Sequence, residues 1–191
     1  MEYKEAIKKI VEAEKNDSYS LSLDELNCPL PKETGNLKSL RTLWCRWSGI
    51  ERLPTEIGHM QQLKVLFLND NNIKYLPGSI TNLKNLHQLY LANNNLEKLP
   101  VGFTDLIQLE VLHLANNNIR QLPDDFSKLS NLRELHLEGN PLEELPDEIH
   151  RLRRLESLSI DEKLIDQSNN ELISLWYNIT MERQKKKEEI M

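Results

Sequence analysis

Along most of this chain, leucines recur at equivalent positions every 23 residues. In each unit a short L-x-L stretch, such as Leu66-Phe67-Leu68, has every second residue apolar, which predicts a strand. An asparagine such as Asn71 follows three residues later, where it can turn the chain and bond to backbone groups. A return arm of the form L-P-x-x-I-x-x-L completes the unit, and its proline favours a short helical or 3₁₀ turn.

Too many residues share this 23-residue spacing for the repeat to arise by chance. Six of the eight prolines lie 23 residues apart, and each of the six follows a leucine. The central strand column reads Leu43, Leu66, Leu89, Leu112, Leu135 and Leu158. One unit cannot bury its apolar face alone, so we expect the units to stack into a continuous one-dimensional core.

The consensus L-x-x-L-x-L-x-x-N-x-I-x-x-L-P-x-x-I-x-x-L resembles the leucine-rich repeat family. Its 23-residue, L-P-containing form is similar to intracellular Ras-associated and Scribble-like proteins and to bacterial leucine-rich-repeat proteins. The resemblance covers about residues 17–163 and implies an α/β solenoid, a leucine-rich repeat horseshoe with a parallel concave sheet of about seven strands. The N-terminal end is irregular, because Leu21-Ser22-Leu23 starts one residue out of register and Ser48 replaces the asparagine.

The ends of such a stack must be covered, and the flanking segments suit this role. Residues 1–16 predict an N-terminal capping helix from helical spacing of Tyr3, Ile7, Ile10 and Val11. The solenoid then occupies residues 17–163. Residues 164–191 predict a C-terminal capping helix and tail, although this helix could instead bind a partner. The signals are the capping box Ser168-Asn169-Asn170-Glu171 and an apolar stripe at Leu172, Leu175, Trp176 and Ile179.

The residue between paired leucines faces away from the core, towards the expected concave surface. Five consecutive units place a ring there, namely Trp44, Phe67, Tyr90, His113 and His136. Adjacent strands lie about 4.8 Å apart, so these rings predict a ladder about 19 Å long. Outward-facing rings are typical of binding surfaces, whereas the alternative is that they only stabilise the sheet by stacking.

The residues beside the rings add polarity to the predicted surface. Glu134, Glu138, Glu156 and Asp161 make its C-terminal end acidic, so a partner with a basic group at one end and apolar side chains at its centre would be complementary. With the five rings, the partner-binding residues that we expect are Arg46, Trp47, Asn69, Gln88 and Glu138.

Composition narrows the possible classes of ligand and compartment. The chain has 191 residues and a net charge of −6, an acidic balance that disfavours nucleic-acid binding. No apolar run reaches the roughly 18 residues of a transmembrane helix, and the charged N-terminus lacks the apolar region of a secretory signal. Cys28 and Cys45 are too few for a disulfide framework and favour the cytoplasm.

The sequence indicates no catalytic or cofactor chemistry. It has no phosphate-binding G-x-x-x-x-G-K-[ST] loop, Cys45 takes an inward leucine position, and Cys28 lacks a paired base. His113 and His136 should lie side by side and could share an ion with Glu134 or Glu138. Because two imidazoles do not make a dense ligand cluster, we expect no metal site and no cofactor.

These observations predict a non-enzymatic, monomeric module that binds a protein partner, with neither nucleic acid nor a membrane as ligand. One alternative is an inert structural spacer whose association depends on its terminal helices. Another is a regulatory or effector subunit that works with a separate enzyme, such as a small GTPase or a ubiquitin ligase. The GTPase is suggested only by the resemblance to Ras-associated repeat proteins.

Overall fold

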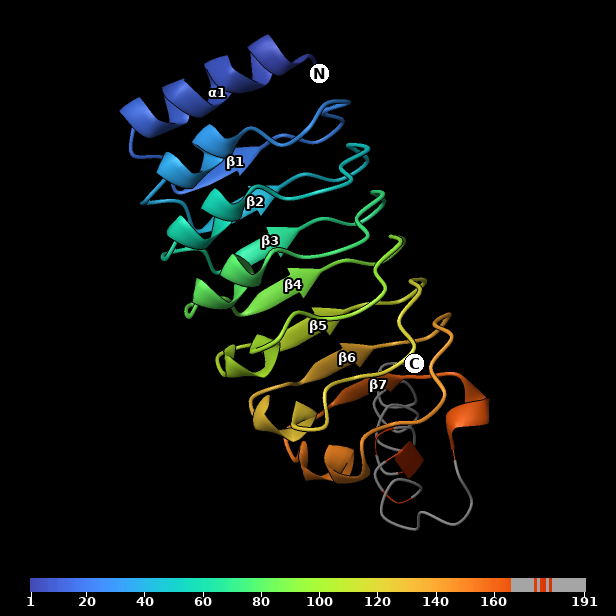
Figure 1. Cartoon of the computed structure of the whole chain (residues 1–191). Coiled ribbons are helices and arrows are strands. Elements are labelled where there is room, and N and C mark those ends of the chain that lie inside the picture. Colours follow the sequence, from blue (N-terminus) through green and yellow to red (C-terminus); the bar gives the residue numbers. More distant parts are fainter. Residues whose placement is uncertain (166–173, 175, 178, 180–191) are drawn as a thin grey trace, which may run out of the picture.

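Seven short parallel strands form one open, curved sheet in chain order, as the resemblance implies (Figure 1). The computed structural model describes residues 1–165 and positions 174, 176, 177 and 179. The strands are β1 (Ser20–Ser22), β2 (Thr42–Trp44), β3 (Val65–Phe67), β4 (Gln88–Tyr90), β5 (Val111–His113), β6 (Glu134–His136) and β7 (Ser157–Ser159).

The return arms form 3₁₀ turns, which confirms the expectation from their prolines. Most of these turns begin right after the L-P pair, where the fixed proline φ suits a tight turn. They stack on one another along the solenoid (Figure 1). Their bounds are Lys32–Asn36, Thr55–His59, Gly78–Asn82, Phe103–Asp105, Phe126–Lys128, Asp147–Arg151 and Glu162–Leu164.

The strands pair in one constant register, which carries the leucine columns through the whole sheet. Leu43 pairs with Leu66, and Leu66 with Leu89, and all three side chains are fully buried. The first coil is one residue shorter, because Leu21 pairs with Leu43. Cys45 continues the buried column, and burial raises the pKa of its thiol far above the usual range. The predicted role of Cys45 as a core side chain is confirmed.

Buried asparagines connect four successive coils to the coil before each of them. In Asn117, for example, Oδ1 accepts a hydrogen bond from the backbone N–H of Leu96 at 2.9 Å. Its Nδ2 donates to the carbonyl oxygens of Leu91 at 2.9 Å and Leu114 at 3.0 Å. Water does not reach these backbone groups, so the amide satisfies them instead. We call the four equivalent residues the asparagine ladder: Asn71, Asn94, Asn117 and Asn140.

Ser48 takes the ladder position in the second coil and makes a smaller set of the same bonds. Its Oγ accepts from the N–H of Leu26 at 3.1 Å and donates to the carbonyl of Arg46 at 2.9 Å. The side chain is fully buried. Serine therefore suffices where the chain meets the shorter first coil.

Helix α1 (Tyr3–Lys15) is present where the sequence predicts it and lies at the N-terminal end of the stack (Figure 1). Its buried face differs from the expected one, because Ala6, Ile10 and Ala13 are buried while Tyr3 and Val11 are exposed. Two alanines on the inner face let the helix backbone approach the first coil closely, which larger side chains would prevent.

The predicted C-terminal features lie almost entirely outside the described residues, including the capping box and Leu172 and Leu175. Of the apolar stripe, Trp176 and Ile179 are described as helical, and Ile179 is buried. Among the described residues, no helix is both long and apolar enough to cross a membrane.

Two glycines allow the first three return arms to approach one another. A methyl group on Gly35 would overlap the backbone and side chain of Glu56, and one on Gly58 would overlap those of Ser79. At the equivalent positions of the later coils the chain has Thr81, Thr104 and Ser127 instead. Glycine therefore allows this close approach only at the N-terminal return arms.

We predict that Asn117→Ala lowers the free energy of unfolding by about 2 kcal/mol or more. It leaves the buried N–H of Leu96 without a partner and removes one of the two side-chain amide bonds to each of the carbonyls of Leu91 and Leu114. Urea unfolding followed by circular dichroism measures the change. The neighbouring Asn118→Ala is the matched control, since Asn118 is exposed, and should change stability by less than about 0.5 kcal/mol. Equal effects of the two substitutions would contradict the structural role of the ladder.

Candidate functional site

Five rings form a continuous stack on the sheet face opposite the leucines; we call Trp44, Phe67, Tyr90, His113 and His136 the ring column. They occupy equivalent register positions on β2 to β6 and are half-buried. The ring centroids of Trp44 and Phe67 lie 5.8 Å apart and the two rings are nearly parallel. The ring centroids of Phe67 and Tyr90 lie 4.5 Å apart. The structure places these five residues side by side and away from the core, as predicted.

The stack changes character along its length. Tyr90 meets His113 edge to face at 4.7 Å, and His113 meets His136 at a tilt with 4.1 Å between centroids. Such contacts are worth about 0.5–1.5 kcal/mol each beyond buried area. Stacking therefore orders the rings, while the sides that face away from the sheet stay accessible. The result is an apolar, aromatic N-terminal part and an imidazole C-terminal part.

Arg46 is held at the N-terminal part by Asp24. Its Nη2 lies 2.8 Å from Asp24 Oδ2, and its backbone N–H donates to Asp24 Oδ1 at 2.6 Å. Although burial opposes ionisation, the hydrogen bonds and charge of Arg46 keep the pKa of Asp24 below its ordinary value. The guanidinium thereby lies over the rings of Trp47 at 5.0 Å and Phe67 at 5.8 Å. Asp24 thus positions a cation against two aromatic faces.

Trp47 is both exposed and conformationally unusual. Its side chain is 53% exposed, and its φ of 51° lies in the left-handed region. The equivalent residues of the following coils share that backbone conformation, but they are Asp70, Asn93, Asn116 and Gly139, the types that tolerate it. A tryptophan there has an energetic cost that packing in the core does not offset.

Two further predicted site residues have structural partners of their own. Asn69 Oδ1 accepts a hydrogen bond from the backbone N–H of Ala92 at 2.9 Å, which links two coils. Gln88 Oε1 accepts from the Tyr90 hydroxyl at 3.2 Å and so fixes the orientation of that ring. Both side chains are half-buried beside the ring column. They are placed to adjust its shape and polarity.

At the C-terminal part, two carboxylates accompany the imidazoles. Glu134 Oε2 lies 3.6 Å from His113 Nε2, and Glu138 Oε1 lies 3.8 Å from His136 Nδ1. Burial, followed by the charge of His136, lowers the pKa of His113 below its usual range despite the opposing effect of Glu134. His113 is therefore predominantly neutral at neutral pH.

Asp24 and Glu134 contact predicted site residues, Arg46 and His113, but are missing from the predicted set. Both residues lie on the same face as the rings. Asp24 occupies the position in the first coil that Arg46 occupies in the second, and Glu134 lies two residues before His136. The two-residue spacing indicates the shared face. It does not indicate that Asp24 would hold Arg46 over the rings, because that depends on side-chain rotamers.

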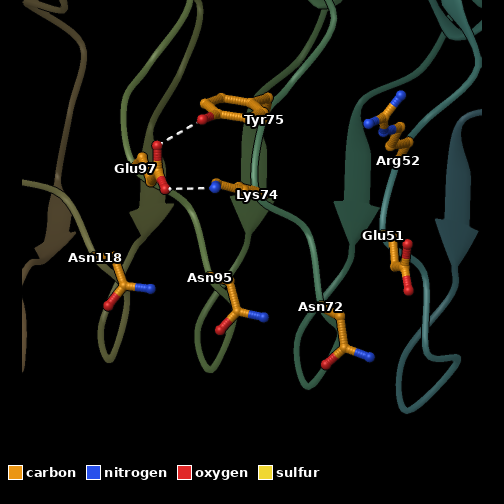
Figure 2. Close-up of a pocket in the computed structure, with 8 residues that line it drawn as sticks. All are labelled: Glu51, Arg52, Asn72, Lys74, Tyr75, Asn95, Glu97 and Asn118. Carbon is orange, nitrogen blue, oxygen red and sulfur yellow. Dashed lines mark hydrogen bonds and ion pairs between the residues drawn. The ribbon is translucent and has the colours of Figure 1, made fainter.

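A polar groove of about 550 Å³ is lined by residues of neighbouring coils, none of which belongs to the ring column (Figure 2). Glu97 contacts two of its neighbours there, with Lys74 Nζ at 2.9 Å and the donating Tyr75 hydroxyl at 2.6 Å. Exposed pairs of this kind are weak and already satisfied. We therefore place the candidate site on the ring column. The groove is lined by Glu51, Arg52, Asn72, Lys74, Tyr75, Asn95, Glu97 and Asn118.

The repeated coil identifies the family. The family model for the leucine-rich repeat region matches residues 21–117, and the leucine rich repeat model matches residues 97–142 and 107–165. The chain belongs to the leucine-rich repeat family. Domains of this family are generally non-enzymatic modules for protein interaction, which supports a protein-interaction module as the general class of this leucine-rich repeat chain.

Two solved leucine-rich repeat structures are similar to the chain. A leucine-rich repeat protein of Leptospira interrogans is 32% identical, with a TM-score of 0.57, and the match covers 70% of this chain and 40% of that one. The leucine-rich repeat domain of the type III effector XopL is 25% identical, with a TM-score of 0.69, over 83% of this chain and 58% of that one. The chain therefore spans less than two thirds of either. No curated protein matches it in sequence.

We predict that Trp47→Asn stabilises the leucine-rich repeat fold by about 0.5–1 kcal/mol. Relief of the left-handed strain gains about 1–2 kcal/mol, whereas loss of the exposed contact with Arg46 costs about 0.5–1 kcal/mol. Denaturant unfolding measures the difference. Trp47→Phe keeps the strain and an aromatic ring, so it should give no gain. A less stable Trp47→Asn variant would contradict the interpretation of strain.

Proposed function

We propose that this leucine-rich repeat chain binds a protein partner on its concave face through the ring column. The observation that carries the proposal is the contiguous stack of five half-exposed rings on the face opposite the leucine core. Aromatic side chains are enriched at the centres of protein interfaces, where their large, rigid surfaces are desolvated. Stacking has already ordered these rings, so binding would restrict little additional side-chain motion.

The exposed tryptophan supports the same conclusion. Trp47 is 53% exposed in a backbone conformation that disfavours it, so its presence does not serve the stability of the coil. Arg46, fixed by Asp24, adds a cation whose hydrogen bonds are only partly used. We propose that Trp47 and Arg46 extend the binding surface at its N-terminal end.

Charge at the other end favours a partner with a positively charged group there. Glu134 and Glu138 are 47% and 42% exposed and lie beside the histidines. A partner with apolar side chains over Phe67 and Tyr90 and a lysine or arginine near these carboxylates would be complementary. We propose further that the protein acts as a cytoplasmic monomer without nucleic-acid or membrane ligands.

The similarity to the leucine-rich repeat domain of a type III effector favours a second candidate function. In that case the chain is the recognition part of a regulatory or effector system that works with a separate enzyme. Recovery of a GTPase or a ubiquitin ligase as the bound partner would support it. The same concave surface would then recognise the enzyme or its target.

We predict that Phe67→Ala combined with Tyr90→Ala weakens partner binding by more than about 2 kcal/mol, close to 30-fold. The partner is first identified by affinity purification with the unmodified chain, and affinities are then measured by calorimetry. Tyr75→Ala is the matched control, because Tyr75 is an exposed aromatic residue that is not part of the ring column and lines the polar groove (Figure 2). It should leave the affinity unchanged.

The outcome is interpretable only if the double variant folds, which a cooperative thermal transition by circular dichroism establishes. A folded double variant with unchanged affinity would reject the ring column as the binding site. Loss of affinity in Tyr75→Ala, with the double variant unaffected, would instead place binding at the polar groove.

Deletion of residues 180–191 separates the proposal from the inert-spacer alternative. If the ring column carries binding, we predict that the deletion changes partner affinity by less than about twofold, or about 0.4 kcal/mol. Calorimetry measures the affinity, and light scattering after size-exclusion chromatography measures the oligomeric state. A deletion that abolishes association while an altered ring column preserves it would favour the spacer.

A further inference from the structure

The C-terminal part of the ring column brings together three side chains that ligate metal ions. Their ligand atoms, one each from His113, Glu134 and His136, all lie within 4.8 Å of one another. The parallel register of β5 and β6 places His113 beside His136. Glu134 lies two residues before His136 on the same strand, so it projects from the same face. Adjacent coils therefore create a two-histidine, one-carboxylate set.

The distances are close to those of a transition-metal site. In a tetrahedral zinc site with bonds of about 2.0–2.1 Å, ligand atoms lie about 3.3 Å apart. His113 Nε2 and Glu134 Oε2 are already 3.6 Å apart. We expect side-chain rotation to supply the remaining contraction. The three side chains are 21–47% exposed, so such rotation would not have to displace core residues.

Two polar atoms in this cluster have unmet hydrogen-bonding capacity. His113 Nε2 and Glu138 Oε2 are shielded from solvent, and neither has a hydrogen-bond partner among the described residues. Glu138 Oε1 lies 3.8 Å from His136 Nδ1, next to the candidate ligands. Shielded polar atoms without partners are uncommon in proteins, and an absent ion is one of the conditions that produces them. Of these two atoms, Glu138 Oε2 lies outside the set of three ligands, so it is an observation separate from their spacing.

We propose that His113, Glu134 and His136 form a binding site for a divalent ion of the zinc type, with Glu138 as an additional carboxylate within reach. Two imidazoles and a carboxylate suit zinc, copper or nickel, whereas magnesium and calcium prefer sites made of oxygen ligands. Three protein ligands leave an open position for water or another donor.

The ion would cross-link β5 and β6 and neutralise the acidic end of the concave face. The site does not depend on the proposed protein partner, since all its ligands come from this chain. From the sequence alone we expect no metal here, because two imidazoles with Glu134 or Glu138 nearby do not make a dense ligand cluster. The structure adds Glu134 at ligand distance and the two unpartnered atoms.

Titration of the whole chain with Zn²⁺ by calorimetry tests the proposal, using protein that carries no affinity tag. We expect one ion per chain, and we expect His113→Gln and His136→Gln each to weaken binding by more than about tenfold. Glu134→Gln should weaken it as well while keeping the side-chain shape. His59→Gln is the matched control, because His59 is an exposed imidazole on a return arm, and it should leave the affinity unchanged.

Substitution with Co²⁺ gives a second measurement, because the visible absorption of the bound ion reports on its coordination. The unmodified chain should give the spectrum of a four-coordinate or five-coordinate site, which His113→Gln should remove. Circular dichroism establishes that each variant is folded. Equal Zn²⁺ affinities of the unmodified chain and of the folded double variant His113→Gln/His136→Gln would overturn the proposal. Equal weakening by His59→Gln would overturn it too.

Discussion

The fold depends on side-chain amides that replace water inside four successive turns. Where a coil leaves its strand, the backbone bends within the protein, and several of its N–H and C=O groups are out of reach of solvent. Each member of the asparagine ladder satisfies groups on its own coil and on the preceding one, as Asn117 does for Leu96, Leu91 and Leu114. The ladder therefore holds successive coils in one register, and the ring column depends on that register for its alignment.

Much of the architecture could be predicted from the sequence because the repeat sets both the strand direction and the register. Once Leu66 and Leu89 are known to pair, the residue after each must face the other side, which places Phe67 beside Tyr90. The return arms were equally predictable, since a proline after leucine restricts the local backbone. These features follow from local geometry repeated without interruption.

Other features depend on packing distances and rotamers that the pattern of apolar residues does not encode. Helix α1 uses Ala6 and Ala13 on its inner face, where hydrophobicity alone favours Tyr3 and Val11. The salt bridge between Asp24 and Arg46 and the convergence of Glu134 on His113 depend on side-chain directions. The left-handed conformation of Trp47 could not be predicted from the sequence. Asparagine, aspartate and glycine indicate such a position, whereas tryptophan does not.

The two glycines on the return arms make the solenoid unequal along its length. Gly35 and Gly58 let neighbouring coils touch backbone to backbone at the outer margin, whereas Thr81, Thr104 and Ser127 place side-chain atoms between later coils. We expect these glycines to give the outer margin a shorter pitch near the N-terminus. Bending to match the contour of a bound molecule would then occur mainly in the later coils, so the tryptophan end would act as the rigid anchor and the histidine end as the compliant one.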